Sequence, residues 1–207
     1  MNKNFISVIF LPFIFVSLMW LVKIYEWYFD LSFSEFGVLP KDILGLQGIV
    51  FSPFIHQDFS HLFNNSYPII ILGILLFYFY KNIAIEIFLW LFFISGLFLW
   101  VVGRPSYHIG ASGLIYALAS FLFLSGLIKK NPRLAAVSLI VTFLYGSMIW
   151  GVFPLKVGVS WEGHLCGLIS GILVALFYKN QGPKRKKYDW ELEEEDTIEV
   201  NYILKEN

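Results

Sequence analysis

The sequence predicts an all-α integral membrane protein with six transmembrane helices. Of its 207 residues, 57% are hydrophobic and only 14% are charged, and the mean hydropathy is +0.68. Ordinary globular domains carry about a quarter charged residues. The apolar residues also gather into runs of about 20, the length that crosses the hydrocarbon core of a bilayer. Lipid is therefore the main solvent of this chain, and we expect no nucleic-acid partner.

Six apolar runs are the predicted spans, at residues 5–25, 61–80, 83–102, 112–128, 134–151 and 163–179. The first run is too long for a cleaved signal peptide and lacks small residues at its end, so we expect a retained helix. Residues 26–60 form a long outer loop rich in aromatic residues, which favour the membrane interface. Residues 1–180 are thus expected to form one membrane domain.

Lysine and arginine favour the cytoplasmic side of a membrane, and their distribution predicts the orientation. With the N-terminus inside, the outer side holds only Lys23, Lys41, Arg104 and Lys156, and all other Lys and Arg fall inside. Both termini are therefore expected to be cytoplasmic. Residues 181–207 change abruptly to a basic run, GPKRKK, and then an acidic run, WELEEED. We expect this tail to be disordered, with the basic run against anionic headgroups.

Four polar residues interrupt the apolar runs at the same predicted depth. They are His61 and Asn65 in the second run, Ser112 at the start of the fourth, and His164 at the start of the sixth. These three runs all pass from outside to inside, so their N-terminal ends face the same side. Polar residues at membrane depth are costly in lipid and are functional candidates by default. The sequence therefore predicts one polar site near the outer face.

The residue types fit nucleophilic catalysis. Serine becomes a nucleophile when a base removes its proton, and a neutral imidazole is the usual base. Gly110 and Gly113 on either side of Ser112 allow a close approach of another backbone, and a helix N-terminus offers free N–H groups to an oxyanion. His61 and Asn65 are four residues apart and share a helix face. The only acidic residue close to Ser112 or His164 along the chain is Glu162, so the hypothesis is a Ser112–His164 dyad.

Structural interpretations stand beside this one. Small residues spaced four apart in a membrane helix usually pack against another helix, and Gly167 and Gly171 are interpreted in that way. A lone Ser or His at membrane depth can be an interhelical hydrogen bond. A metal site made of His56, His61 and His164 is a further alternative. The single cysteine, Cys166, excludes an intrachain disulfide and a cysteine-based zinc cluster, and we expect neither metal nor cofactor.

Three motifs, taken together, resemble the rhomboid family of intramembrane serine proteases in its basic six-helix form. They are HQDFSHLFNN at 56–65, GASGLIYA at 110–117 and GHLCGLISG at 163–171, and the resemblance covers roughly residues 1–180. It implies that Ser112 is the nucleophile and His164 the base. It also implies that His61 and Asn65 line the oxyanion hole with the Ser112 backbone.

The resemblance implies further roles around these residues. Tyr116 corresponds to a tyrosine that stacks on the base, and His56 to a supporting histidine. Gly167 and Gly171 correspond to glycines that let the fourth and sixth helices touch. The chain departs from the family in its first outer loop, which lacks the common Trp–Arg pair. It also carries His108 close to the nucleophile, either as a second donor or as an ordinary loop residue.

The function implied is an endopeptidase that cleaves transmembrane segments of protein substrates near the outer membrane face. Six helices and no transit peptide point to a bacterial plasma membrane, and the sequence gives no oligomeric state. One alternative is a catalytically inactive relative that binds membrane helices as an adaptor or chaperone. Another is a small transporter, which predicts paired charges at mid-depth. Only Glu86 lies inside a predicted span, and it is placed to pair with Lys81 or to reach the interface.

Overall fold

The computed structural model describes residues 3–144, 151–154 and 158–183, which are mainly helical and include no extended strand. The long helices are α1 (Lys3–Phe29), α3 (Phe59–Phe79), α4 (Ala84–Val102), α5 (Ser112–Ile128), α6 (Pro132–Leu144) and α8 (Trp161–Phe177). Short helices η1 (Ser34–Phe36), η2 (Leu44–Gln47), α2 (Gly48–Phe51) and η3 (Ser52–Phe54) lie between α1 and α3. The predicted all-α class is confirmed in this described part.

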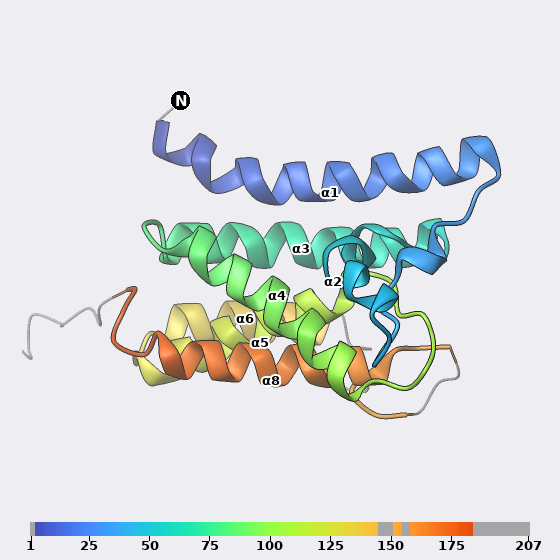
Figure 1. Cartoon of the computed structure of the whole chain (residues 1–207). Helices are drawn as coiled ribbons and strands as arrows, with labels where there is room; N and C mark the ends of the chain where they lie inside the picture. Colours follow the sequence, from blue (N-terminus) through green and yellow to red (C-terminus); the bar gives the residue numbers. More distant parts are fainter. Residues whose placement is uncertain (1–2, 145–150, 155–157, 184–207) are drawn as a thin grey trace, which may run out of the picture.

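The helices lie side by side as an elongated bundle (Figure 1). Helix α1 runs along one side and packs against α3, to which the Trp20 indole donates a 3.0 Å hydrogen bond at Ser66 Oγ. Helix α4 crosses the bundle obliquely. Helices α5, α6 and α8 form the opposite side, where α5 and α8 make the most extensive contact in the described structure.

Three described helices are long and apolar enough to cross a membrane, namely Ile9–Phe29 of α1, Phe59–Phe79 and Ala84–Val102. Helices α5 and α8 are apolar but have 17 residues each, the lower limit for a span. The predicted fifth span, 134–151, matches α6 only as far as Leu144, because residues 145–150 lie outside the described part. The count of six spans and the orientation therefore stay predictions.

Helices α3, α5 and α8 all begin at one end of the bundle, and local sequence explains where each begins. Asp58 caps α3 by accepting a 2.7 Å hydrogen bond from the His61 amide, and Ser160 caps α8 by accepting one from the Gly163 amide. Helix α5 follows a turn at Gly110, whose φ of +102° favours glycine. Polar residues near the three helix starts are thereby brought to the same end.

Glycines set the distance between α5 and α8. A Cβ atom on Gly167 would clash with the Gly113 carbonyl oxygen, and one on Gly171 would clash with the Ala117 carbonyl oxygen and Ser120 Oγ. Ser120 Oγ also donates a 3.0 Å hydrogen bond to the Leu168 carbonyl across the same interface. The two backbones therefore touch, as small residues in membrane helices commonly permit.

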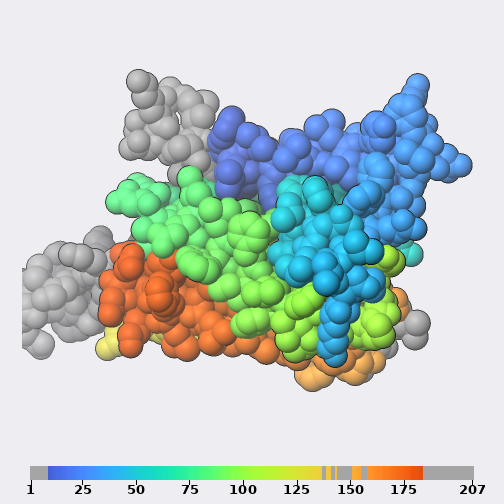
Figure 2. All heavy atoms as spheres, viewed as in Figure 1, coloured from blue at the N-terminus to red at the C-terminus, as the bar shows by residue number. Residues whose placement is uncertain are grey.

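The segment between α1 and α3 packs beside the end of α4 that lies nearest the start of α5, as the blue and cyan surface in Figure 2 shows. The Trp100 indole donates a 2.8 Å hydrogen bond to the Asp42 carbonyl. Val38 and His108 exchange two backbone hydrogen bonds of 2.9 Å. The predicted outer loop thus contains short helices and is attached to α4 and to the turn before α5.

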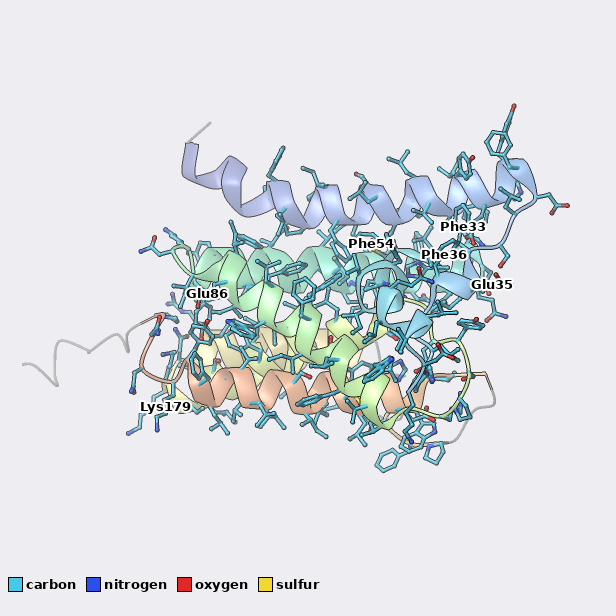
Figure 3. All side chains as sticks on the ribbon, in the orientation of Figure 1. Phe33, Glu35, Phe36, Phe54, Glu86 and Lys179 are labelled. Carbon is cyan, nitrogen blue, oxygen red and sulfur yellow. The ribbon has the colours of Figure 1, made fainter. Side chains whose placement is uncertain are left out.

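The opposite end of the bundle carries Glu86 and Lys179 (Figure 3). Tyr178 Oη donates a 2.6 Å hydrogen bond to Glu86 Oε1, so the structure gives Glu86 a tyrosine partner where the sequence suggested Lys81. The Lys129 ammonium donates a 2.9 Å hydrogen bond to the Lys179 carbonyl, which closes the C-terminal end of α8. Of the predicted tail at 181–207, residues 184–207 lie outside the described part.

Candidate active site

Ser112 and His164 meet between the first turns of α5 and α8. Ser112 Oγ lies 2.9 Å from His164 Nε2, and His164 Nδ1 lies 2.7 Å from the Gly151 carbonyl oxygen. A carbonyl oxygen only accepts hydrogen bonds, so Nδ1 carries the proton and Nε2 is the free acceptor for the Ser112 hydroxyl. This tautomer is the one a general base needs.

The His164 ring is held on its face by Tyr116. The two ring centroids are 4.4 Å apart and the planes are inclined by 13°, a stacked arrangement. Tyr116 lies one helical turn after Ser112 on α5, so the residue that carries the hydroxyl and the residue that orients the imidazole belong to one rigid element. The Tyr116 and His164 side chains are both buried.

His61 and Asn65 lie on α3 and approach the same turn from the other side. A Cβ on Gly110 would lie 2.7 Å from His61 Cε1 and 3.5 Å from Asn65 Nδ2, so only glycine fits there. Asn65 is buried, and its Nδ2 has no hydrogen-bond partner within the described residues. A buried amide donor without a partner is costly, and here it lies beside the turn that leads to Ser112.

The first turn of α5 has no side-chain cap. Its N-cap residue, Ala111, has no side chain that can cap the helix, so the first amides of α5 keep free N–H groups that point out of the helix end. Ser112 and Gly113 are half-buried, whereas Leu114 is buried. The Asn65 amide and the His61 ring lie beside Gly110, two residues before Ser112, at a helix start where negative charge is favourable.

His56 supports this group without joining it. Its side chain is 1% exposed, and its ring lies edge-on to the His61 ring with centroids 5.0 Å apart. Burial, and next the neighbouring His61, lower the pKa of His56 to about 3. A neutral ring at this position contacts His61 without adding charge beside it.

A small recess, with about 30 Å³ of space for water and an opening to solvent, adjoins Ser112. Its walls include Ser52, Ser95, Ser112 and Ser160, with Gly113 and Gly163 where α5 meets α8. Hydroxyl groups on several walls suit bound water. The recess gives solvent a route to the Ser112 hydroxyl from the side of α4.

Glu162 is turned away from the Ser112–His164 pair. Its Oε1 lies 3.4 Å from Arg104 Nη1, and Arg104 Nη2 donates a 2.9 Å hydrogen bond to the Val159 carbonyl. The position a triad carboxylate would occupy at His164 Nδ1 is taken by the Gly151 carbonyl. His108 is buried in the turn before α5, and its ring contacts Ser160 rather than Ser112.

The sequence analysis missed two partners of the site. The Gly151 carbonyl orients His164, and a backbone carbonyl has no signature in a residue string. Ser160 is the N-cap of α8, and its position before an acidic first turn was the available signal. Within the described residues no group of three or more His, Cys, Asp or Glu side chains is placed to hold a metal ion, so the His56–His61–His164 alternative has no ligand set there.

Comparison with known proteins adds an independent finding. A family model described as "Rhomboid domain" matches residues 45–181. An uncharacterised protein of Mycobacterium tuberculosis is 32% identical over 185 residues, covering 83% of this chain and 75% of that protein. One of Mycobacterium leprae is 34% identical, covering 83% and 71%. A protein of Acanthamoeba polyphaga mimivirus, named as a rhomboid protein, is 27% identical over 132 residues, covering 60% and 71%.

Proposed function

This chain belongs to the rhomboid family of integral membrane proteins, and we propose that it is an active intramembrane serine endopeptidase. The observation that carries the proposal is the 2.9 Å approach of Ser112 Oγ to His164 Nε2, with the other ring nitrogen bonded to a carbonyl. A hydroxyl, an acceptor nitrogen and an orienting partner in this order are the parts of an activated serine. The substrates are transmembrane segments of other proteins.

In the first half-reaction, His164 Nε2 takes the proton of Ser112 as Oγ attacks the scissile carbonyl carbon. The carbonyl oxygen becomes an oxyanion beside the Ser112 amide, the Asn65 amide and the His61 ring. The imidazolium then gives its proton to the leaving amine nitrogen, the C–N bond breaks, and an acyl-enzyme forms on Oγ. Asn65 supports this role, because its buried Nδ2 has no other partner in the described residues.

In the second half-reaction, water enters by the recess beside Ser112. His164 removes a proton from the water as its oxygen attacks the acyl carbon. The proton then passes to Ser112 Oγ, which leaves, and the carboxylate product is released. A transmembrane substrate must unwind before cleavage, because helical hydrogen bonds occupy its carbonyl groups. Substrates with helix-breaking residues near the cut are therefore preferred.

Six spans with both termini in the cytoplasm form part of the proposal. The end that holds Ser112 also holds the start of α3, α5 and α8, whereas Lys81, Lys129, Lys130 and Lys179 lie at or beyond the other helix ends. Excess lysine favours the cytoplasmic side. Ser112 then lies near the outer face, and a bacterial plasma membrane is the expected location.

Reconstitution in liposomes tests the proposal. A single-span substrate with Gly or Pro near its outer end is mixed with wild type, Ser112→Ala, His164→Ala or the control Ser125→Ala, which removes a serine at the other end of α5. We expect wild type and Ser125→Ala to cleave, and the two site variants to lose roughly 10⁴-fold or more in rate. Equal cleavage by Ser112→Ala would overturn the proposal, and binding of the substrate without cleavage by wild type would favour an inactive adaptor.

A further inference from the structure

His108 is a buried imidazole that the proposed reaction does not use. Its side chain is 3% exposed, and both its backbone N–H and its carbonyl oxygen are hydrogen-bonded to Val38. The ring points to the start of α8: Nδ1 lies 2.6 Å from Ser160 Oγ, and Nε2 lies 3.1 Å from the Arg104 carbonyl oxygen. One side chain thus joins the turn that leads to Ser112 to the helix that carries His164.

The partners determine how the protons are placed. The Arg104 carbonyl only accepts, so His108 Nε2 carries the hydrogen and Nδ1 accepts one from Ser160 Oγ. The Ser160 oxygen in turn accepts the Gly163 amide of α8 at 3.3 Å. Burial lowers the pKa of His108, which favours the neutral ring that this pattern needs. Both ring nitrogens are engaged, so His108 has no free donor for substrate.

We propose that His108 is a positioning residue, whose hydrogen bond with Ser160 fixes the start of α8 so that His164 stays within reach of Ser112. The inference rests on the proposed function and adds to it a residue that acts through another. The path is short, because Ser160 is the N-cap residue, Gly163 bonds to it, and His164 is the next residue. Displacement of a reacting group by about 1 Å can cost roughly 100-fold in rate.

Arg104 makes a second link between the same two segments, through Glu162 and the Val159 carbonyl. The Arg104 side chain is 41% exposed, but the Glu162 side chain is only 8% exposed, so loss of the Arg104 charge would leave a buried carboxylate without its partner. The His108–Ser160 contact is part-buried and shorter, with 2.6 Å between Nδ1 and Oγ. Arg104→Lys is therefore the matched control, because it keeps a cation beside Glu162, weakens the Val159 contact and leaves the His108–Ser160 hydrogen bond in place.

Two substitutions separate the halves of the His108 contact. In His108→Asn, the amide oxygen is attached to Cγ, the same atom to which Nδ1 is attached in histidine. The variant therefore keeps a hydrogen-bond acceptor for Ser160. In His108→Gln the amide nitrogen reaches toward Nε2 and keeps the Arg104 contact, but the acceptor is lost. We expect His108→Gln to lower kcat between about 10- and 100-fold with KM little changed. His108→Asn should recover most of that loss, and Arg104→Lys should stay near wild type.

A double-mutant cycle tests whether His108 acts through Ser160. If it does, His108→Gln combined with Ser160→Ala is no slower than the slower single variant. Ser160→Thr keeps the hydroxyl and should retain kcat. Additive losses, equal kcat for His108→Asn and His108→Gln, or a loss that appears only in KM would overturn the positioning role.

Hydrogen exchange separates this inference from the proposed function. In detergent-solubilised full-length protein, we expect the amides at 161–165 to exchange roughly fivefold faster in His108→Gln than in wild type, as when a helix N-cap is lost. His108→Asn and Arg104→Lys should match wild type. Equally slow exchange in all variants would overturn the positioning role of His108 even if the enzyme is active. If the variants show the expected exchange differences but the wild type never cleaves substrate, the proposed function is overturned and the positioning role remains.

Discussion

The end of the bundle that holds Ser112 differs from the end that holds Glu86 in how its polar side chains are used. Near Ser112 the polar groups are buried, and His56, Asn65, His108 and His164 all have exposed fractions below a tenth. At the opposite end, where Figure 3 labels Glu86, this residue is exposed and accepts a hydrogen bond from Tyr178 Oη. Burial of polar groups costs free energy unless they are bonded.

This difference shows where burial of polar groups costs free energy. At the Glu86 end, the charged groups stay exposed to water, and the Lys129 ammonium bonds to a carbonyl at the end of α8. Exposed charges avoid the free-energy cost of desolvation. At the Ser112 end, Asn65 Nδ2 is buried and has no partner in the described part of the chain. Such groups are rare in native proteins, and the described residues hold one at the Glu86 end as well, the buried Tyr80 Oη. What distinguishes the Ser112 end is that its unpartnered amide donor lies beside Gly110, two residues before Ser112.

Apart from the Ser112–His164 pair itself, the largest effect expected belongs to Asn65. Asn65→Ala should lower kcat by about 10²–10³-fold, because one preformed oxyanion donor is lost. Asn64→Ala is the matched control, since Asn64 is the exposed neighbour on the same helix. Steady-state cleavage in liposomes measures both. Equal rates for the two variants would remove Asn65 from the oxyanion site.

The α5–α8 interface connects the two ends, and Gly167→Ala tests it. The added methyl group would clash with the Gly113 carbonyl oxygen, a backbone atom that cannot move away by a rotamer change. We expect the free energy of unfolding to fall by about 1–3 kcal/mol, as for overpacking in a core, and cleavage to fall because α8 moves from α5. Leu165→Ala on the exposed face of α8 should do less. Thermal unfolding in detergent compares them, and equal stability would contradict the packing account.

Acid should destabilise the Ser112 end through His56. Its pKa is about 3 when folded and near 6.5 when unfolded, so below pH 6.5 the unfolded chain binds a proton that the folded protein excludes. Stability is therefore lost as the pH falls from about 6.5 toward 3, by about 2 kcal/mol between pH 7 and pH 5. His56→Gln should show a smaller loss over that range. Identical pH dependence of the melting temperature in both proteins would contradict the assignment.

The smallest effect is expected at the Glu86 end. Tyr178→Phe removes the 2.6 Å hydrogen bond to Glu86. We expect the free energy of unfolding to fall by only about 1 kcal/mol, because water replaces the tyrosine as the partner of the exposed carboxylate. Cleavage at a temperature where the variant is folded should be unchanged. A kcat that falls as far as in Asn65→Ala would show that the two ends are not separate in function.

The helices and most candidate residues could be predicted from the sequence, because long apolar runs and polar interruptions are local patterns. The approach of Ser112 to His164 was expected from the shared depth of two helix starts, and the structure adds the distance. The short helices between α1 and α3 were not predicted, since their residues lie in a loop with no clear period. The Gly151 carbonyl and the His108–Ser160 contact were not predictable either, because both depend on how distant turns meet.

The most direct measurement is covalent labelling of the detergent-solubilised protein with a fluorescent fluorophosphonate, followed by mass spectrometry of the labelled peptide. Wild type, Ser112→Ala and His164→Ala are compared at equal folded fractions. The account predicts a phosphonylated Ser112 in wild type and no adduct in either variant, because the hydroxyl reacts only when the imidazole takes its proton. An adduct that persists in His164→Ala, or a folded wild type that fluorophosphonates of large and small size both leave unlabelled, would contradict it.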